Sequence, residues 1–206
     1  MSDFYREPQR ETVQELRVRK SIFLAHVRIC RNEESARENL KSICEEHRQA
    51  NHSCWAYRIG AGKISEYFSD GGEPSGTAGR PILGAIQKKG TTNTLIVVAR
   101  YFGGIKLGVR GLIEAYGKSA AGCLDAAGLR ILRMKKKYAI LLPYESQHIL
   151  LHVLDAAEAL REDIAGEYAE AVRITCSVPL DNAPDFEKSL SALQGSRRVN
   201  SWIVLS

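Results

Sequence analysis

Two glycine-rich stretches contain the residue types that bind phosphate groups. The first is SDGGEPSGTAGRP, from Ser69 to Pro81, and the second is RYFGGIKLGVRG, from Arg100 to Gly111. When a strand runs into a glycine loop and then into a helix, the free amide N–H groups at the helix start and the helix dipole attract an anion. We therefore predict that seven residues bind phosphate: Arg80, Arg100, Gly103, Gly104, Lys106, Gly108 and Arg110.

The second stretch departs from the common nucleotide-binding loops. Gly103 and Gly108 have the four-residue gap of a P-loop, but Val109 and Arg110 stand where that loop requires Lys and Ser/Thr. The GxGxxG pattern of dinucleotide-binding folds is missing as well. The sequence therefore argues against a P-loop NTPase and against a dinucleotide-dependent enzyme.

Four further residues are secondary candidates. His52 and Cys54 share one face of a predicted strand and could form an activated nucleophile, but a partly buried structural pair is the favoured interpretation. Asp70 and Glu73 lie in the first glycine-rich stretch, where they could hold Mg²⁺ or accept hydrogen bonds from turn amides. We favour the turn, and we predict no catalytic residue, no bound metal and no cofactor.

Two aromatic residues follow Arg100. Arg100, Tyr101 and Phe102 could present a guanidinium and a stacking face to an unpaired base of single-stranded RNA. Aromatic rings at the end of a buried strand are more often core residues, whereas an arginine there is hard to bury without a partner. We therefore keep Arg100 as a site residue and omit Tyr101.

The predicted elements around these stretches form an N-terminal α+β domain. Two strands between residues 12 and 30 meet near Arg19 and Lys20, and Asn32 caps a helix that packs on their sheet. A nearly all-apolar strand at 94–102 is expected to be buried on both faces. The remaining predicted elements are strands at 53–59 and 64–68, a helix at 79–89 and a helix after the loop GGIKLGVRG.

A second domain is predicted to begin at about Lys135, and the basic run Lys135–Lys137 is interpreted as the junction. The domain boundaries are therefore 1–134 and 135–206. The second domain has the order βαββαβ, with Asn182 as the cap of its second helix, and this order predicts a ferredoxin-like sandwich of two helices on a four-stranded antiparallel sheet. Its predicted elements are a strand at 138–142, a helix at 144–157, strands at 160–168 and 171–178, a helix at 183–193 and a strand at 199–205.

Charge is distributed unequally along the chain. Residues 1–137 contain 24 Lys and Arg against 14 Asp and Glu, whereas residues 138–206 contain 5 against 10. This asymmetry favours a polyanionic partner such as RNA, although a merely solvated basic surface is an equal alternative. No run reaches the roughly 18 apolar residues of a membrane span, and the five cysteines form no CxxC pair. We expect a cytoplasmic protein with reduced thiols.

Three sequence elements resemble the IMPACT/YigZ family. The string Val97 to Gly108 is similar to its pattern of aliphatic residues, Arg, two aromatics and Gly-Gly. The segment Glu73 to Pro81 is similar to its GEPxGTAGxP element, and His52, Cys54, Trp55 and Ala56 are similar to HxCWA. Gly71 stands where most members have a second Asp, and Val109-Arg110 replaces a usual Thr-Gly pair.

The resemblance implies both a fold and a functional class. It implies an N-terminal domain resembling a ribosomal-protein and elongation-factor-G domain, a ferredoxin-like C-terminal domain, and a link to translation. We expect a non-enzymatic RNA- or ribosome-associated factor that binds the phosphate backbone. The alternatives are a small enzyme or binding protein for a phosphorylated metabolite, and a protein-interaction adaptor.

Overall fold

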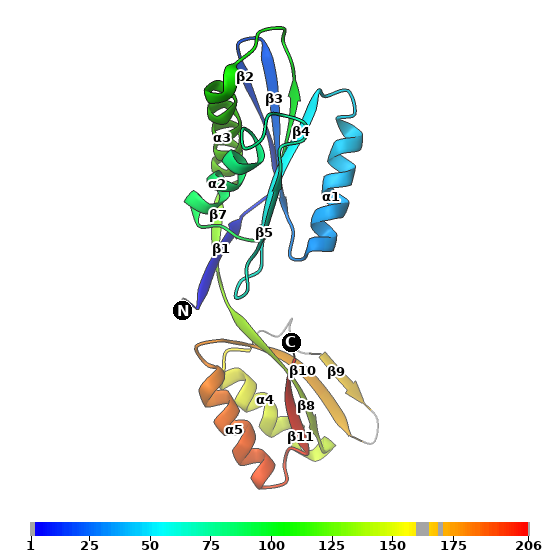
Figure 1. Cartoon of the computed structure of the whole chain (residues 1–206). Coiled ribbons are helices and arrows are strands. Elements are labelled where there is room, and N and C mark those ends of the chain that lie inside the picture. The colour runs from blue at the N-terminus through cyan, green and yellow to red at the C-terminus, as the bar shows by residue number, and fades with distance from the viewer. Residues whose placement is uncertain (1–2, 160–164, 169–170, 206) are drawn as a thin grey trace. The chain divides into compact units, whose positions relative to one another are not determined.

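The chain folds into two compact units. The computed structural model describes residues 3–159, 165–168 and 171–205 of the 206. The N-terminal unit is Tyr5–Leu132, and the C-terminal unit contains Arg133 onwards together with the first residues of the chain. Each unit has its own hydrophobic core (Figure 1).

A five-stranded antiparallel sheet forms the centre of the N-terminal unit. Its strand order is β2-β3-β6-β4-β5, and every neighbouring pair is antiparallel. The central strand β6 is buried along all but its last residue, which confirms the prediction from its apolar run. The strands are β2 (Thr12–Val18), β3 (Ser21–Ile29), β4 (His52–Ile59), β5 (Ser65–Ser69) and β6 (Thr94–Tyr101).

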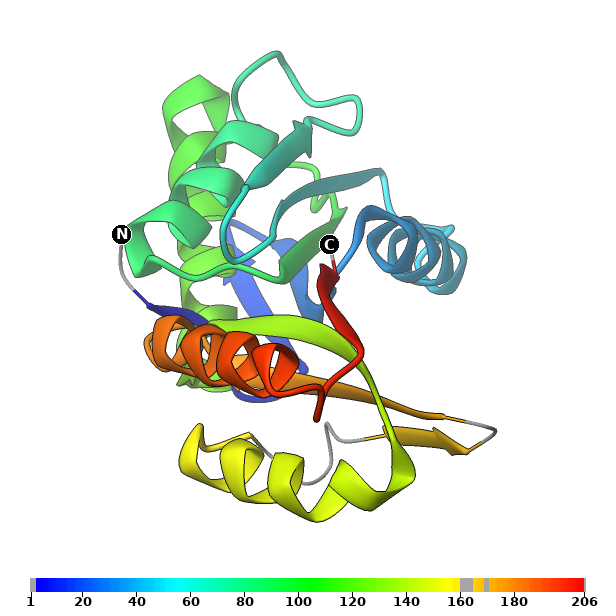
Figure 2. The same cartoon turned by 90° about the horizontal axis from the view of Figure 1, so that it is seen from below.

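Helices cover both faces of this sheet. Helices α2 (Gly79–Lys89) and α3 (Gly108–Ala127) pack on one face, and α1 (Glu33–Glu46) packs on the other (Figures 1 and 2). Asn32 caps α1 as predicted, because its side-chain oxygen accepts a 2.8 Å hydrogen bond from the Ser35 amide. The α2 bounds equal the predicted bounds, and Gly90 ends that helix in the left-handed conformation.

A two-stranded sheet of β1 (Phe4–Pro8) and β7 (Leu129–Arg133) was not predicted. The Glu7 side chain is fully buried there, and it accepts hydrogen bonds from Arg130 at 2.5 Å and from Asn93 at 2.9 Å. Burial alone would raise the pKa of Glu7, but these hydrogen bonds and the nearby arginines hold it below its ordinary value. A buried carboxylate thus joins strands that are far apart in the sequence.

The C-terminal unit contains a four-stranded antiparallel sheet and two helices. The strand order is β11-β8-β10-β9, and α4 and α5 connect the strands in the predicted sequence order. The elements are β8 (Lys135–Leu142), the 3₁₀ turn η1 (Tyr144–Ser146), α4 (Gln147–Ala156), β9 (Ala165–Tyr168), β10 (Val172–Pro179), α5 (Ala183–Gly195) and β11 (Ser201–Leu205).

The structure bears on three expectations about this unit. The basic run Lys135–Lys137, which we interpreted as the junction, forms the start of β8 and pairs with β10. Asn182 precedes α5 but makes no side-chain cap: its backbone is helical (φ −90°, ψ −11°) and not extended as a cap residue usually is, and its side-chain nitrogen donates to the Ala157 carbonyl at 3.1 Å. Residues 160–164 of the predicted strand 160–168 lie outside the described residues.

None of the helices in the described part of the chain has the length and apolarity needed to span a bilayer.

Candidate functional site

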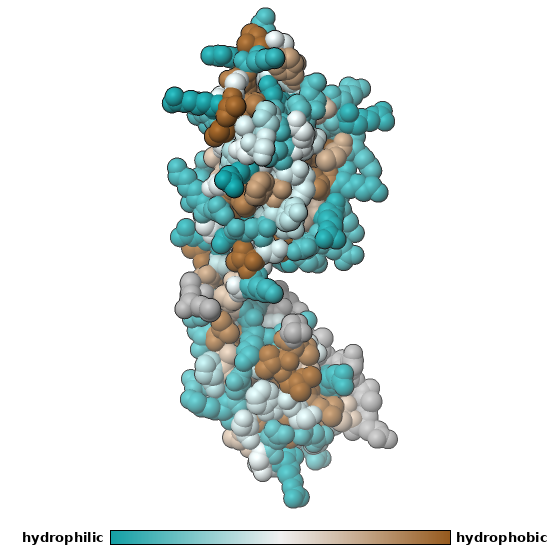
Figure 3. Space-filling view, in the orientation of Figure 1, coloured by the Kyte–Doolittle hydropathy of each residue, from teal (hydrophilic) through white to brown (hydrophobic). Residues whose placement is uncertain are grey.

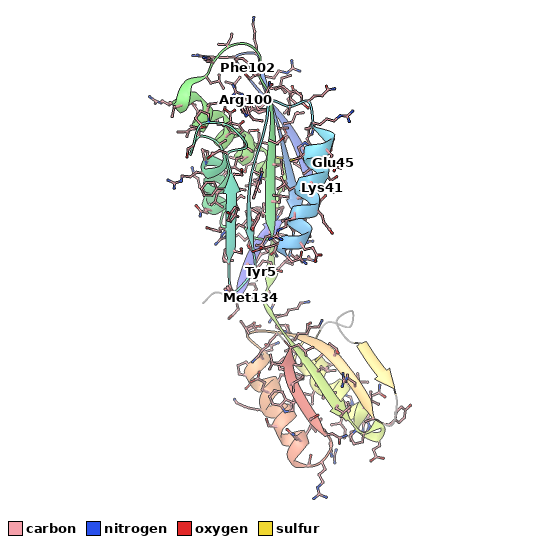
Figure 4. The ribbon with its side chains drawn as sticks, turned by 45° about the vertical axis from the view of Figure 1, so that its right-hand side comes forward. Tyr5, Lys41, Glu45, Arg100, Phe102 and Met134 are labelled. Atoms are coloured by element: carbon pink, nitrogen blue, oxygen red, sulfur yellow. The ribbon has the colours of Figure 1, made fainter. Side chains whose placement is uncertain are left out.

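A pocket of about 470 Å³ opens where β6 ends, between the two glycine-rich stretches. The first stretch contributes Glu73 to its wall, and the second contributes Lys106 and Gly108 at the start of α3. Arg100 and Phe102 lie at this end of the N-terminal unit (Figure 4). The pocket therefore combines residues from segments that are separate in the sequence.

A buried ion pair forms the inner wall of the pocket. Arg100 Nη1 donates to Glu73 Oε1 at 2.6 Å, and neither side chain is more than 6% exposed. Tyr116 Oη donates to the same carboxylate oxygen at 2.9 Å. Burial, followed by the neighbouring Cys54 and Glu73, raises the pKa of Tyr116, so its phenol stays protonated as a donor. Glu73 therefore neutralises the arginine that the sequence assigned to phosphate.

The Arg100 guanidinium also lies between two aromatic rings. Its central carbon is 5.4 Å from the ring centroid of Phe23 and 5.4 Å from that of Phe102, which is within the range of cation–π attraction. Phe23 is fully buried, whereas Phe102 is 43% exposed. The Nε atom of Arg100 is buried and has no hydrogen-bond partner among the described residues. Arg100 thus supports the partly exposed ring of Phe102, and its Nε–H group remains without an acceptor among the described residues.

Asp70 stabilises the first glycine-rich stretch, the alternative that its turn position favoured. Its carboxylate accepts hydrogen bonds from the amides of Gly76, Ala78 and Gly79 at 2.8–3.0 Å. Burial alone would raise the pKa of Asp70, but these three bonds and the nearby Arg80 lower it below its ordinary value. The carboxylate is therefore ionised and occupied by backbone donors.

Gly71 explains one departure from the family pattern. Its φ is +54°, and a Cβ atom added here would lie 2.2 Å from the Ser53 carbonyl oxygen. A second aspartate does not fit this backbone without a shift of the loop. The loop conformation in this chain therefore depends on glycine at position 71.

His52 and Cys54 contact different backbone carbonyls. Burial, the largest influence, raises the pKa of Cys54 to about 12, and its thiol contacts the Asp70 carbonyl at 2.9 Å. Such a thiol is protonated at neutral pH and is a poor nucleophile. His52 lines the pocket, with Nδ1 3.1 Å from the Gly71 carbonyl and Nε2 4.0 Å from Glu73 Oε2. The structure supports the structural interpretation of Cys54.

The other predicted residues have different positions. Arg80 is exposed in the first turn of α2 and does not line the pocket, and the exposed Arg110 also lies outside its lining. Gly103 has a structural reason to be glycine, because a Cβ there would lie 2.0 Å from the Lys20 carbonyl oxygen. Gly104 contributes no wall, and its φ of +84° marks the turn of the loop.

Tyr116 and Phe23 were not predicted as site residues. Both follow the apolar periodicity of core positions, and both are fully buried with their rings 5.1 Å apart in an edge-to-face contact. Their polar role appears only in three dimensions, where the Tyr116 hydroxyl meets Glu73 and the Phe23 ring meets Arg100. The only feature of the sequence that could have indicated this role is the hydroxyl of Tyr116 at a core position, since a buried hydroxyl needs a hydrogen-bond partner.

A second hollow of about 540 Å³ lies between α1 and the strands β4 and β5. Trp55, Tyr57 and Tyr67 line it, with their ring planes within 24° of one another and their centroids 6.0–6.3 Å apart. Glu33 in its wall is engaged by Arg37 and Ser65. The hollow contains none of the predicted site residues.

Comparison with known proteins assigns the chain to a family. The Impact N-terminal domain model matches residues 19–124. IMPACT family member YigZ of Escherichia coli is 31% identical over 181 residues, which cover 84% of this chain and 85% of that protein. The chain belongs to the IMPACT/YigZ family. Every residue of the pocket wall lies inside the segment that matches the family model.

One further relative and one solved structure are similar to this IMPACT-family chain over different lengths. IMPACT family member YvyE of Bacillus subtilis is 44% identical over 115 residues, or 56% of this chain, and the match spans only about half, 53%, of YvyE. A solved structure titled "Crystal structure of an hypothetical protein" superposes with a TM-score of 0.73 at 26% identity, covering 100% of this chain and 98% of that one. The two-unit α+β architecture is therefore shared with a solved structure.

Proposed function

We propose that this IMPACT-family protein is a non-enzymatic, cytoplasmic factor linked to translation, which binds single-stranded RNA or the ribosome through the pocket of the N-terminal unit. The exposed ring of Phe102 beside Lys106 is the observation that supports this most. Aromatic rings stack on unpaired bases of any sequence, and a nearby cation binds the adjoining phosphate. Both residues line the pocket, so it offers both kinds of contact.

The parts of the pocket have separate roles in this proposal. The Arg100 guanidinium is paired with Glu73 and is therefore not assigned to phosphate. Its role is to orient the Phe102 ring, which it contacts. Lys106 and Arg110 are exposed, and neither forms an ion pair within the described residues, so both are available to phosphate. The amides at the start of α3 add the dipole contribution that the glycine loop predicts.

The finer fold assignments belong to the same proposal. We infer that residues 135–206 form a ferredoxin-like domain, which the order β11-β8-β10-β9 and the βαββαβ sequence support. We also infer that residues 1–134 form a domain like those of ribosomal proteins and elongation factor G, as the family resemblance implies. Folds of this kind are compatible with an RNA surface as the partner.

Fluorescence anisotropy with labelled single-stranded oligonucleotides tests the proposal, with cosedimentation on ribosomes as a second readout. Binding should weaken steeply with salt, since each neutralised phosphate releases counterions. Lys106→Ala and Arg110→Ala should each make the salt dependence shallower by roughly one ion, and Phe102→Ala should weaken binding by about 1–3 kcal/mol. Lys41→Ala is the matched control, because Lys41 is exposed on α1 (Figure 4).

RNA binding whose affinity does not change with salt concentration, or the absence of binding to both RNA and ribosomes, would contradict the proposal.

A second candidate function is binding or turnover of a phosphorylated metabolite. It is favoured by the imidazole of His52, which lies 4.0 Å from the Glu73 carboxylate inside the pocket. A ligand of that class should raise the melting temperature in a panel of nucleotides and phosphate esters with Mg²⁺ present. A shift with a small phosphate ester, without RNA binding, would favour this second function.

A further inference from the structure

Three side chains with metal-ligating atoms converge on the face of the sheet that α1 covers. His26 lies on β3, while Glu46 is the last residue of α1 and His47 follows it directly. One ligand atom of each lies within 4.8 Å of the others. His26 and His47 are buried, and Glu46 is exposed, so the cluster reaches from the interior to solvent.

The two imidazoles point their Nε2 atoms at each other. These atoms are 2.7 Å apart, and the ring planes are inclined by 63°, so the rings meet edge-on. Glu46 Oε1 is 3.7 Å from the same Nε2 atom of His47. Two nitrogens bound to one tetrahedral zinc ion at about 2.0–2.1 Å lie about 3.3 Å apart, so the two Nε2 atoms must separate by roughly 0.6 Å. A small outward rotation of one ring would therefore admit an ion.

A second side chain orients one of the imidazoles. His47 Nδ1 lies 3.0 Å from Tyr101 Oη, and a metal-bound histidine usually donates its other N–H to such an oxygen. When His47 donates from Nδ1 to the phenol oxygen, its Nε2 has a free lone pair directed at His26.

We propose that His26, Glu46 and His47 form a zinc-binding site, with water completing the coordination at the exposed side. Two imidazoles and one carboxylate suit Zn²⁺, whereas Mg²⁺ and Ca²⁺ prefer oxygen ligands only. The site is distinct from the pocket, since Tyr101 and Arg100 are neighbours on β6 whose side chains contact opposite faces of the sheet.

One feature of the cluster limits its affinity. A zinc-bound His26 ring carries its proton on Nδ1, and this buried atom has no hydrogen-bond partner among the described residues. Second-shell partners of ligating histidines typically contribute a factor of about 10 to 100 in metal affinity. We therefore expect binding weaker by about that factor than at a site whose histidines are both hydrogen-bonded.

A competing site must be removed before the test. His148 and His152 are exposed one helical turn apart on α4, and such a pair binds Zn²⁺ by itself. Calorimetric titration with ZnCl₂ is therefore carried out on the full chain with His148→Gln and His152→Gln, freed of metal beforehand. One equivalent of Zn²⁺ is expected to bind, and Co²⁺ in its place should give the visible absorption of a tetrahedral site.

Single variants in that background identify the ligands. His47→Gln should weaken Zn²⁺ binding by more than about 100-fold and Tyr101→Phe by about 10-fold, as for a second-shell partner. Glu46→Gln should weaken it by about 10-fold, and this exposed change leaves the fold intact. Glu45→Gln, at the neighbouring exposed glutamate, is the matched control and should bind as the parent does.

The titration has two outcomes that would overturn the assignment. The first is the absence of Zn²⁺ binding once His148 and His152 are replaced. The second is an unchanged Zn²⁺ affinity in both Glu46→Gln and His47→Gln. Circular dichroism of the metal-free variants distinguishes loss of a ligand from loss of the fold.

Discussion

The two carboxylates of the first glycine-rich stretch, Asp70 and Glu73, have different roles, which their spacing in the sequence does not reveal. Glu73 accepts from Arg100 and Tyr116 in the pocket wall, whereas Asp70 accepts only from backbone amides. The sequence identified both as carboxylates in a turn, and it favoured turn stabilisation for both. That interpretation describes Asp70 well, but the ion pair of Glu73 depends on a strand that is 27 residues away.

Asp70→Asn tests the role of the carboxylate in the turn. The amide loses the acceptor for the Gly76 N–H, so the free energy of unfolding at neutral pH should fall by about 1–2 kcal/mol. Because the pKa of Asp70 is lowered on folding, the unfolded chain takes up this proton first as pH falls. The stabilisation is therefore complete above the ordinary value near 3.8 and is lost below it.

Urea denaturation of the wild type and Asp70→Asn at several pH values between about 2 and 7 measures this effect. The difference between the two proteins should be largest at neutral pH and should shrink in acid. A constant difference across the whole pH range would show that the charge of Asp70 does not contribute. Lys188→Ala, at an exposed residue of the C-terminal unit, serves as the control.

At the scale of elements, strand β6 shows why Arg100 could be predicted from the sequence as a site residue, whereas its neighbours on the adjoining strands could not. The apolar run from Leu95 to Ala99 predicted a strand covered on both sides, and the structure has helices on both. The register Phe23↔Arg100↔His52 brings three strands together at one end. Periodicity predicts faces, but it does not predict register, so these neighbours were not foreseeable.

The loop after β6 is tied to the β2–β3 turn by close backbone contact. Gly103→Ala would place a methyl group 2.0 Å from the Lys20 carbonyl oxygen, in a turn where Arg19 and Lys20 both have positive φ. We expect the free energy of unfolding to fall by about 2 kcal/mol or more, because backbone must move to make room. The pocket residues after Gly103 should lose their positions at the same time.

Gly122→Ala is the matched control for that change. Gly122 is exposed within α3, and a Cβ added there meets nothing within 4 Å. Alanine is a better helix former, so this variant should gain up to about 1 kcal/mol. Thermal and urea unfolding of both variants check the pair, and equal effects of the two substitutions would contradict the steric explanation.

At the scale of the whole molecule, the two units have separate hydrophobic cores, and the two parts of the chain have net charges of opposite sign. The basic residues belong largely to the segment before position 138, and the acidic excess follows it. Apolar surface is present on the C-terminal unit in Figure 3, and β11 exposes Ile203 by 59% and Val204 by 45%. Hydrophobic patterning predicted the element order of this unit, whereas the predicted cap at Asn182 does not form, because this residue has a helical and not an extended backbone.

Because each unit has its own core, residues 1–134 should fold when expressed alone. This fragment keeps all pocket residues and the basic loop, so it should bind single-stranded RNA with the salt dependence of the full chain. Circular dichroism and anisotropy measure both properties. A folded fragment that does not bind RNA, when the full chain does, would mean that the acidic C-terminal unit contributes to the interface.

The pairing of β1 with β7 affects the order in which the protein can be completed during synthesis. Gln9 and Gly128 join their backbones at 3.0 Å, and Glu7 needs Arg130 for its burial. At about 5–20 residues per second, a ribosome takes several seconds to more than 20 s to make the intervening chain. The sheet β2-β3-β6-β4-β5 can assemble in that interval and can hold β1 through Thr91, Thr92 and Asn93, but the edge of β1 that pairs with β7 stays open to a nascent-chain binding factor until β7 is made.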